Sequence, residues 1–126
     1  MKNIKFYVCE HCGNIVYMVN DSGVNPVCCG KKMTLLEAGV VEASREKHIP
    51  VITIDGNTVT VSVGSVTHPM TDEHNIAWVY LATDKGGSFK YLKATEEPTV
   101  KFTIADEKPI AAYAYCNLHG LWKADV

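Results

Sequence analysis

Residues 51–63, with the sequence VITIDGNTVTVSV, decide the fold of the larger part of this 126-residue chain. β-Branched residues fill both arms of the stretch, and residues 55–57 between them have the composition of a hairpin turn. The second arm, residues 58–63, alternates strictly between a valine and a hydroxyl residue, so its valines share one face of a strand. The stretch therefore predicts a β-hairpin with one apolar face.

The sequence on the C-terminal side of this hairpin also has the composition of β-strands. Short runs of β-branched and aromatic residues recur at regular spacing, with turn residues between them and no convincing helix. This pattern is typical of an antiparallel β-sandwich. The further strands are expected over residues 76–82, 88–93, 99–104, 110–116 and 121–123.

The sequence on the N-terminal side of the hairpin has a different character. Residues 1–36 hold two short strand candidates, 4–8 and 14–19, and outside these candidates few apolar residues are left to build a core. Residues 37–47 form a connector of mixed composition. We therefore predict two domains, residues 1–37 and residues 38–126.

Four of the five cysteines lie in the first domain. An odd number of cysteines argues against a disulfide framework. A Cys-x2-Cys pair followed by an adjacent pair supplies four thiolates, which suits a tetrahedral site for either zinc or iron. The four residues are Cys9, Cys12, Cys28 and Cys29.

The remaining cysteine and four histidines lie in the second domain, at the expected ends of strands. Rigid scaffolds present functional groups at such positions. Cys116 and His119 have the spacing of a chelate from one short loop. Five protein ligands exceed the usual four of zinc, and they suit a six-coordinate iron with one position left for a substrate. The predicted donors are His48, His68, His74, Cys116 and His119.

The composition excludes several classes of function. The net charge of −2 offers no basic face for nucleic acid. No apolar run approaches the roughly 20 residues that span a bilayer, and the first residues lack the apolar segment of a signal peptide. We therefore expect a cytoplasmic protein with no membrane or nucleic-acid partner.

Taken together, the motifs resemble those of one known family. They are Cys9-x2-Cys12-x15-Cys28-Cys29, then Glu46-Lys47-His48-x-Pro50, then Gly64-Ser65-Val66-x-His68-Pro69-Met70 with His74, and finally Cys116-Asn117-Leu118-His119-Gly120. The combination runs over essentially the whole chain and is similar to desulfoferrodoxin, the two-iron superoxide reductase family.

The resemblance implies a fold and a function. The first domain would be a desulforedoxin-like module with an Fe(Cys)4 centre, and the second an immunoglobulin-like β-sandwich. Its iron would lie in the plane of the four histidines, with Cys116 axial and the opposite position open to superoxide in the ferrous state. Lys47 would lie beside that open position, and Glu46 would occupy it in the oxidised enzyme. The product would be hydrogen peroxide, in defence against oxidative stress, and the resemblance also implies a homodimer and a rubredoxin-type electron donor.

Other functions explain part of the same residues. A rubredoxin-like electron carrier accounts for the four N-terminal cysteines, and a structural zinc protein does the same. Neither accounts for Cys116 together with four histidines at strand ends. A superoxide dismutase differs in its products, because it releases oxygen as well as peroxide.

Overall fold

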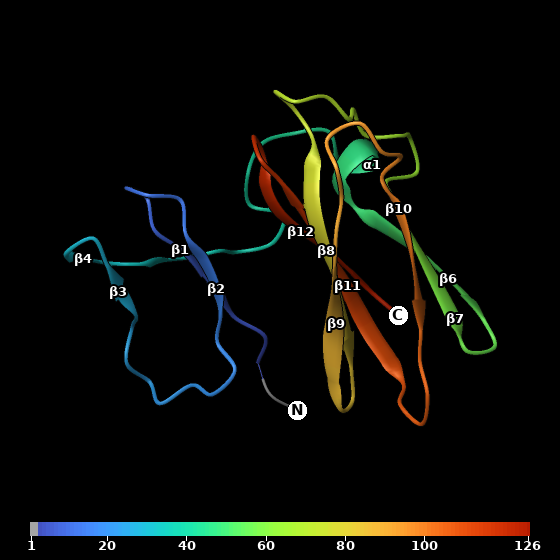
Figure 1. Ribbon diagram of the computed structural model, residues 1–126, viewed down its shortest axis with the longest axis horizontal. Coiled ribbons are helices and arrows are strands. Elements are labelled where there is room, and N and C mark those ends of the chain that lie inside the picture. The colour runs from blue at the N-terminus through green and yellow to red at the C-terminus, as the bar shows by residue number, and fades with distance from the viewer. Residues whose placement is uncertain (1–2) are drawn as a thin grey trace. The chain divides into compact units, whose positions relative to one another are not determined.

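The computed structural model describes residues 3–126 and divides the chain into two compact units, Met1–Glu37 and Ala38–Val126 (Figure 1). Strands dominate both units, and their neighbours pair antiparallel. The predicted fold class is therefore confirmed: a mostly β chain in which a small cysteine module precedes an antiparallel β-sandwich. Within the described residues, no helix is long and apolar enough to cross a membrane.

The first unit is built from very short strands. One sheet has the order β2-β1-β5, and a separate hairpin joins β3 to β4. The cysteine sulfur of Cys9 is part of the small core, with Tyr7 and Met33. The sequence predicts two strands here, in the positions of β1 and β2. The bounds are β1 Phe6–Val8, β2 Ile15–Tyr17, β3 Val27–Cys28, β4 Lys31–Lys32 and β5 Thr34–Leu35.

The second unit consists of two sheets. One has the order β10-β7-β6 and the other β12-β11-β8-β9. All strands predicted for this part of the chain are present, and their ends differ from the predicted ones by at most two residues. The bounds are β6 Pro50–Asp55, β7 Thr58–Val63, β8 Ile76–Thr83, β9 Gly86–Tyr91, β10 Thr99–Thr103, β11 Pro109–Cys116 and β12 Gly120–Asp125.

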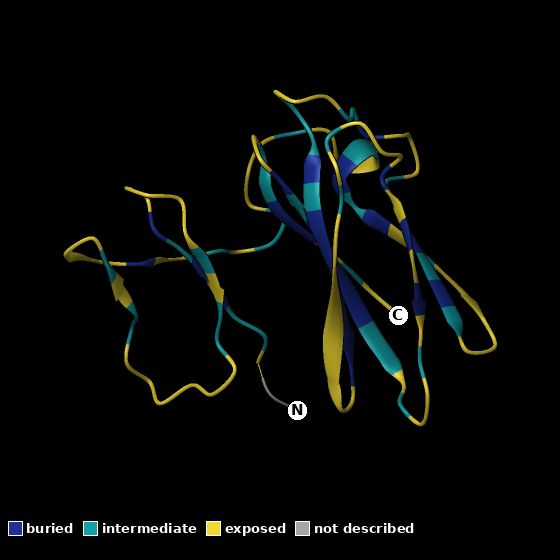
Figure 2. Cartoon of the chain, viewed as in Figure 1, coloured by how far each residue is buried: buried dark blue, intermediate teal, exposed yellow. Residues whose placement is uncertain are grey.

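The valines of β7 fill the space between the two sheets. Val59, Val61 and Val63 are almost completely buried, while the hydroxyl residues between them are partly exposed (Figure 2). They share one core with residues of β8, β10 and β11. Cys116 belongs to this core as well, so the last residue of β11 is both a core residue and a candidate metal donor.

One element departs from the sequence prediction. The connector 37–47 was predicted only as a stretch of mixed composition, and residues Arg45–His48 at its end form the single helical turn α1. Four residues are too few for a periodic apolar pattern to appear in a sequence. The turn ends where Pro50 favours an extended residue before it, and Ile49 is extended with φ −70° and ψ 122°.

A cavity in the β7 core should destabilise the second unit. Val61→Ala removes two buried methyl groups, and we expect a loss of about 2–3 kcal/mol in the free energy of unfolding. Thr60→Ala, on the opposite face of the same strand, is the matched control. Urea unfolding followed by tryptophan fluorescence measures this unit, because Trp78 and Trp122 both lie in it. Equal losses in the two variants would contradict the core position of Val61.

Candidate metal centres

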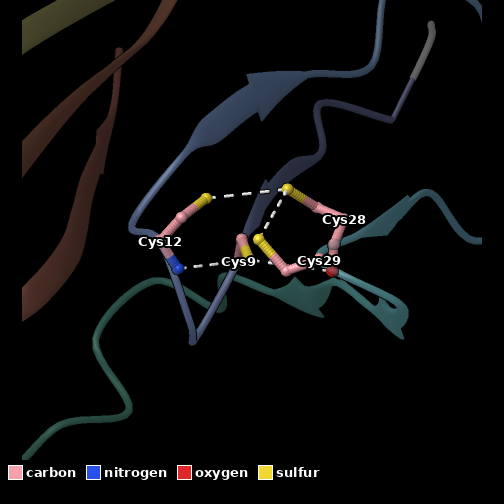
Figure 3. Close-up of side chains that lie close together, drawn as sticks. All are labelled: Cys9, Cys12, Cys28 and Cys29. Atoms are coloured by element: carbon pink, nitrogen blue, oxygen red, sulfur yellow. Dashed lines mark hydrogen bonds between the residues drawn. The ribbon is translucent and has the colours of Figure 1, made fainter.

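The four N-terminal cysteines converge in the first unit, with their sulfurs turned toward one another (Figure 3). The Sγ atoms of Cys12 and Cys28 lie 3.6 Å apart, and those of Cys28 and Cys29 lie 3.9 Å apart. Tetrahedral ligands with metal–sulfur bonds of roughly 2.3 Å would lie about 3.8 Å apart. The spacing of the sulfurs therefore suits a tetrahedral metal ion.

The backbone around these cysteines explains how an adjacent pair reaches one site. Successive side chains of an extended strand point to opposite faces. Cys29 instead adopts a left-handed conformation with φ 53°, and Gly30 after it has φ 75°. This turn brings the Cys29 sulfur back to the side of Cys28.

The four thiols have unequal acidities. Hydrogen bonds from the backbone N–H groups of Cys12 and His11 lower the pKa of Cys9 to about 6. Hydrogen bonding with the thiols of Cys12, Cys9 and Cys28 raises the pKa of Cys29 to about 12. Four thiolates at this spacing repel one another unless a cation lies between them. His11 is exposed, and the described cluster consists of cysteines alone.

The second set of donors gathers at one end of the sandwich, from four separate segments. His48 is the last residue of α1, and His68 and His74 lie in the connection between β7 and β8. Cys116 ends β11, and His119 lies in the turn that leads to β12. Donor atoms of His48, His68, His74 and Cys116 all lie within 4.8 Å of one another. His119 completes the set, with its Nδ1 atom 3.1 Å from His48 Nε2 and 3.8 Å from Cys116 Sγ.

The four imidazoles form a square. Going round it in the order His48, His68, His74 and His119, neighbouring ring centroids lie 4.6, 4.7, 5.1 and 4.9 Å apart, with interplanar angles of 77–86°. The diagonal from His48 to His74 is longer, at 6.4 Å. Four tetrahedral ligands would be equally far apart in every pair, so this arrangement is not that of a four-coordinate zinc site.

The protonation of two rings is set by backbone carbonyl groups. His48 Nδ1 lies 2.6 Å from the Ser44 carbonyl oxygen, and His68 Nδ1 lies 2.7 Å from that of Pro69. Each Nδ1 therefore carries the proton and donates it, which leaves the Nε2 atom of each neutral ring with a lone pair. These two Nε2 atoms face each other at 3.1 Å. Ligands at right angles on a metal with bonds of roughly 2.1 Å lie about 3.0 Å apart.

Burial keeps these donors in the forms that bind metal. It lowers the pKa of His68 to about 4, and it also lowers the pKa values of His48 and His74. The Nε2 atom of His74 is buried without a hydrogen-bond partner in the structure. A buried polar atom without a hydrogen-bond partner is rare in proteins, and this nitrogen is free to bind a metal ion. The donor set thus fits a metal ion held by four imidazoles and one sulfur.

The fifth donor, Cys116, lies against the square. Its sulfur lies close to the donor atoms of all four histidines, whose rings already occupy the four corners. Burial raises the pKa of the Cys116 thiol, while the backbone N–H groups of Leu118 and His119 act in the opposite direction. Those N–H groups would stabilise a thiolate at this position.

Lys47 and Glu46 precede His48 in α1. Burial is the main cause of the lowered pKa values of His48 and His74, neighbouring imidazoles act in the same direction, and the charge of Lys47 adds the smallest contribution. Glu46 is exposed, and its contacts come from the backbone. The Glu46 carbonyl oxygen accepts hydrogen bonds from Val66 N–H at 2.9 Å and from the Ser65 hydroxyl at 3.2 Å.

Residues that hold these segments were not identified from the sequence. A Cβ atom at Gly64 would lie 2.5 Å from the Glu46 carbonyl oxygen, so only glycine lets this loop approach α1 so closely. Trp122 packs on the His48 ring with centroids 5.0 Å apart, and its Nε1–H donates to the His119 carbonyl oxygen at 3.0 Å. Gly64 lies in one of the quoted motifs but was given no role there, and Trp122 lies outside all of them. The three-residue spacing between His119 and Trp122 was the one feature of the sequence that could have indicated a contact between them.

Comparisons with known proteins agree across the chain. The family model described as "Desulfoferrodoxin" matches residues 40–125, and that described as "Desulfoferrodoxin, N-terminal domain" matches residues 2–36. The chain is 44% identical over 121 residues to the desulfoferrodoxin of Nitratidesulfovibrio vulgaris, which covers 96% of this chain and 95% of that protein.

Solved structures give the same result. The superoxide reductase from Treponema pallidum matches with a TM-score of 0.84 and 38% identity, over 98% of this chain and all of that chain. The one-iron superoxide reductase from Giardia intestinalis matches with a TM-score of 0.56 and 33% identity. That match covers 64% of this chain and 97% of the Giardia chain. The matched part is longer than the 37 residues of the first unit, so it must include residues of the second unit.

Each cluster draws its donors from one unit, so the two metals should be lost separately. We expect Cys29→Ser to remove the metal of the first cluster alone and Cys116→Ser that of the second alone. Iron per chain, measured by emission spectrometry on protein from iron-supplied cells, would fall from two to about one in each variant. The visible spectra of the variants would differ, and together they would account for that of the unchanged chain. Loss of both metals from either variant would contradict separate centres.

Proposed function

The chain belongs to the desulfoferrodoxin family, as its motifs predict, and from this membership we propose that it is a superoxide reductase. In the proposed reaction, superoxide takes up one electron and two protons and becomes hydrogen peroxide. The observation that carries the proposal is the square of four imidazoles with one cysteine sulfur against it. Five donors leave a sixth position of an iron ion for substrate.

Iron is the metal that both donor sets fit. We propose that Cys9, Cys12, Cys28 and Cys29 hold one iron, and that His48, His68, His74, His119 and Cys116 hold the other. Ferrous iron at the second site would supply the electron, and with one thiolate and four neutral imidazoles it would leave the site with a net positive charge. The first site has no free position, which suits electron transfer without substrate binding.

The chain itself contributes a cation beside the donors. Lys47 directly precedes the donor His48 in α1, and superoxide is a small anion. We infer that Lys47 raises the local concentration of superoxide and orients it by a charge-assisted hydrogen bond. Glu46, the neighbouring residue, is proposed to close the open position in the oxidised enzyme.

Further parts of the proposal rest on the family. A rubredoxin-type carrier is proposed to return the electron after each turnover. We also propose that the chain works as a cytoplasmic homodimer in defence against oxidative stress.

The products of the reaction test the proposal. Iron-loaded, reduced protein should consume superoxide and form one hydrogen peroxide for each superoxide, without release of oxygen. Stopped-flow absorption measures the consumption of superoxide, and an oxygen electrode measures any release of oxygen. Oxygen release would identify a dismutase, and no reaction of fully reduced protein would leave an electron carrier. The Cys116→Ser variant serves as the inactive control.

Removal of the Lys47 charge should slow the capture of superoxide. We expect Lys47→Ala to lower the second-order rate constant about tenfold and to weaken its dependence on ionic strength, because the steering charge is lost. Lys47→Arg should retain most of the rate. Lys101→Ala, which removes an exposed charge from β10, is the matched control. A rate and salt dependence equal to those of the control would contradict steering by Lys47.

A further inference from the structure

The four histidines of the second cluster are not fastened in the same way. The rings of His48 and His68 are each fixed by a hydrogen bond from Nδ1 to a backbone carbonyl. No hydrogen bond between residues 3–126 in the structure fixes the ring of His74, and its buried Nε2 has no partner. The direction of this ring therefore depends on how firmly its backbone is held.

The Asn117 side chain holds that backbone on both sides of His74. Its Oδ1 atom accepts a hydrogen bond from Asn75 N–H at 2.9 Å, and its Nδ2 group donates one to the Glu73 carbonyl oxygen at 2.9 Å. Glu73 and Asn75 are the two residues that flank His74. A carboxamide is the side chain that offers both a donor and an acceptor in this geometry.

Asn117 also belongs to the loop that carries two other donors. It lies between Cys116 and His119, and its own N–H donates to the Asn75 carbonyl oxygen at 3.2 Å. The loop of His74 is closed internally by different bonds. Asn75 Nδ2 donates to the Thr71 carbonyl at 2.9 Å, and Thr71 Oγ1 accepts from His74 N–H at 3.1 Å. Those bonds shape the loop, but they do not tie it to Cys116.

We propose that Asn117 is a positioning residue that clamps His74. Its amide joins the loop of Cys116 and His119 to the loop of His74, and so fixes three donors of one metal site relative to one another. Partners that orient metal ligands from outside the first coordination sphere commonly contribute about 10- to 100-fold to metal affinity. The inference depends on the proposed function only for the identity of the metal.

The release of iron to a chelator tests the clamp in the full chain. We expect Asn117→Ala to lose the iron of the second site about tenfold faster, while the iron of the Cys9–Cys29 site is lost at an unchanged rate. The absorption band and the electron paramagnetic resonance spectrum of the oxidised second site should also change. Asn57→Ala is the matched control, since this exposed asparagine lies in the turn at the far end of β6.

A second variant separates hydrogen bonding from charge. Asn117→Asp keeps the acceptor for Asn75 N–H but loses the donor to the Glu73 carbonyl. The added negative charge would by itself hold a cation more firmly, so faster iron loss in this variant supports the donor bond. Asn117→Ala behaving like Asn57→Ala in both iron release and spectrum would overturn the clamp.

The same experiment distinguishes this inference from the proposed function. An unchanged chain that holds iron at the second site but does not reduce superoxide would overturn the function alone, and the comparison of variants would still decide the clamp. An unchanged chain with no iron at that site would overturn both. The activity of the unchanged chain tests the proposed function, and the difference in iron release between the variants tests the clamp.

Discussion

The lone pairs of His48 Nε2 and His68 Nε2 face each other at 3.1 Å, because each ring carries its proton on Nδ1 and donates a hydrogen bond from there to a backbone carbonyl. Two acceptors at this distance repel unless a proton or a metal ion lies between them. Burial of both rings disfavours the proton. The end of the sandwich is therefore built for a cation, and its surrounding segments are arranged to keep that geometry: the turn α1, the loop after β7 and the turn after β11.

The sandwich makes this arrangement possible because its packed core reaches the residues that carry the donors. Cys116 is at once the last residue of β11 and a member of the core, so its sulfur cannot move without disturbing the packing of β7 and β8. The first unit has no comparable rigid core to position its donors. Its strands are two or three residues long and its core is small, so the cysteines supply the cohesion that apolar residues cannot.

The sequence predicts most of this because its signals are local. The alternation in residues 58–63 gives the face of β7, and the chemistry of histidine and cysteine at strand ends gives the donors. The turn α1 and the strands β3 to β5 were missed, since two to four residues carry no readable period. The sequence did not reveal the supporting roles of Asn117, Gly64 and Trp122. The partners of Asn117 and Gly64 are distant in the sequence, and the partner of Trp122 is a backbone carbonyl group, which no side-chain pattern marks. The square order of the imidazoles likewise appears only when three segments meet, namely α1, the connection between β7 and β8, and the turn after β11.

The two donor sets explain why one chain would carry both. Four sulfurs at tetrahedral spacing fill the coordination of a metal, so the first site can pass electrons but has no place for a substrate. The second set has five donors, namely four imidazoles in a square and one sulfur against it, and a six-coordinate ion there keeps one free position. An electron carrier has no use for such a position. The coordination number, more than the choice of ligands, therefore favours an enzyme that binds a small substrate over an electron carrier.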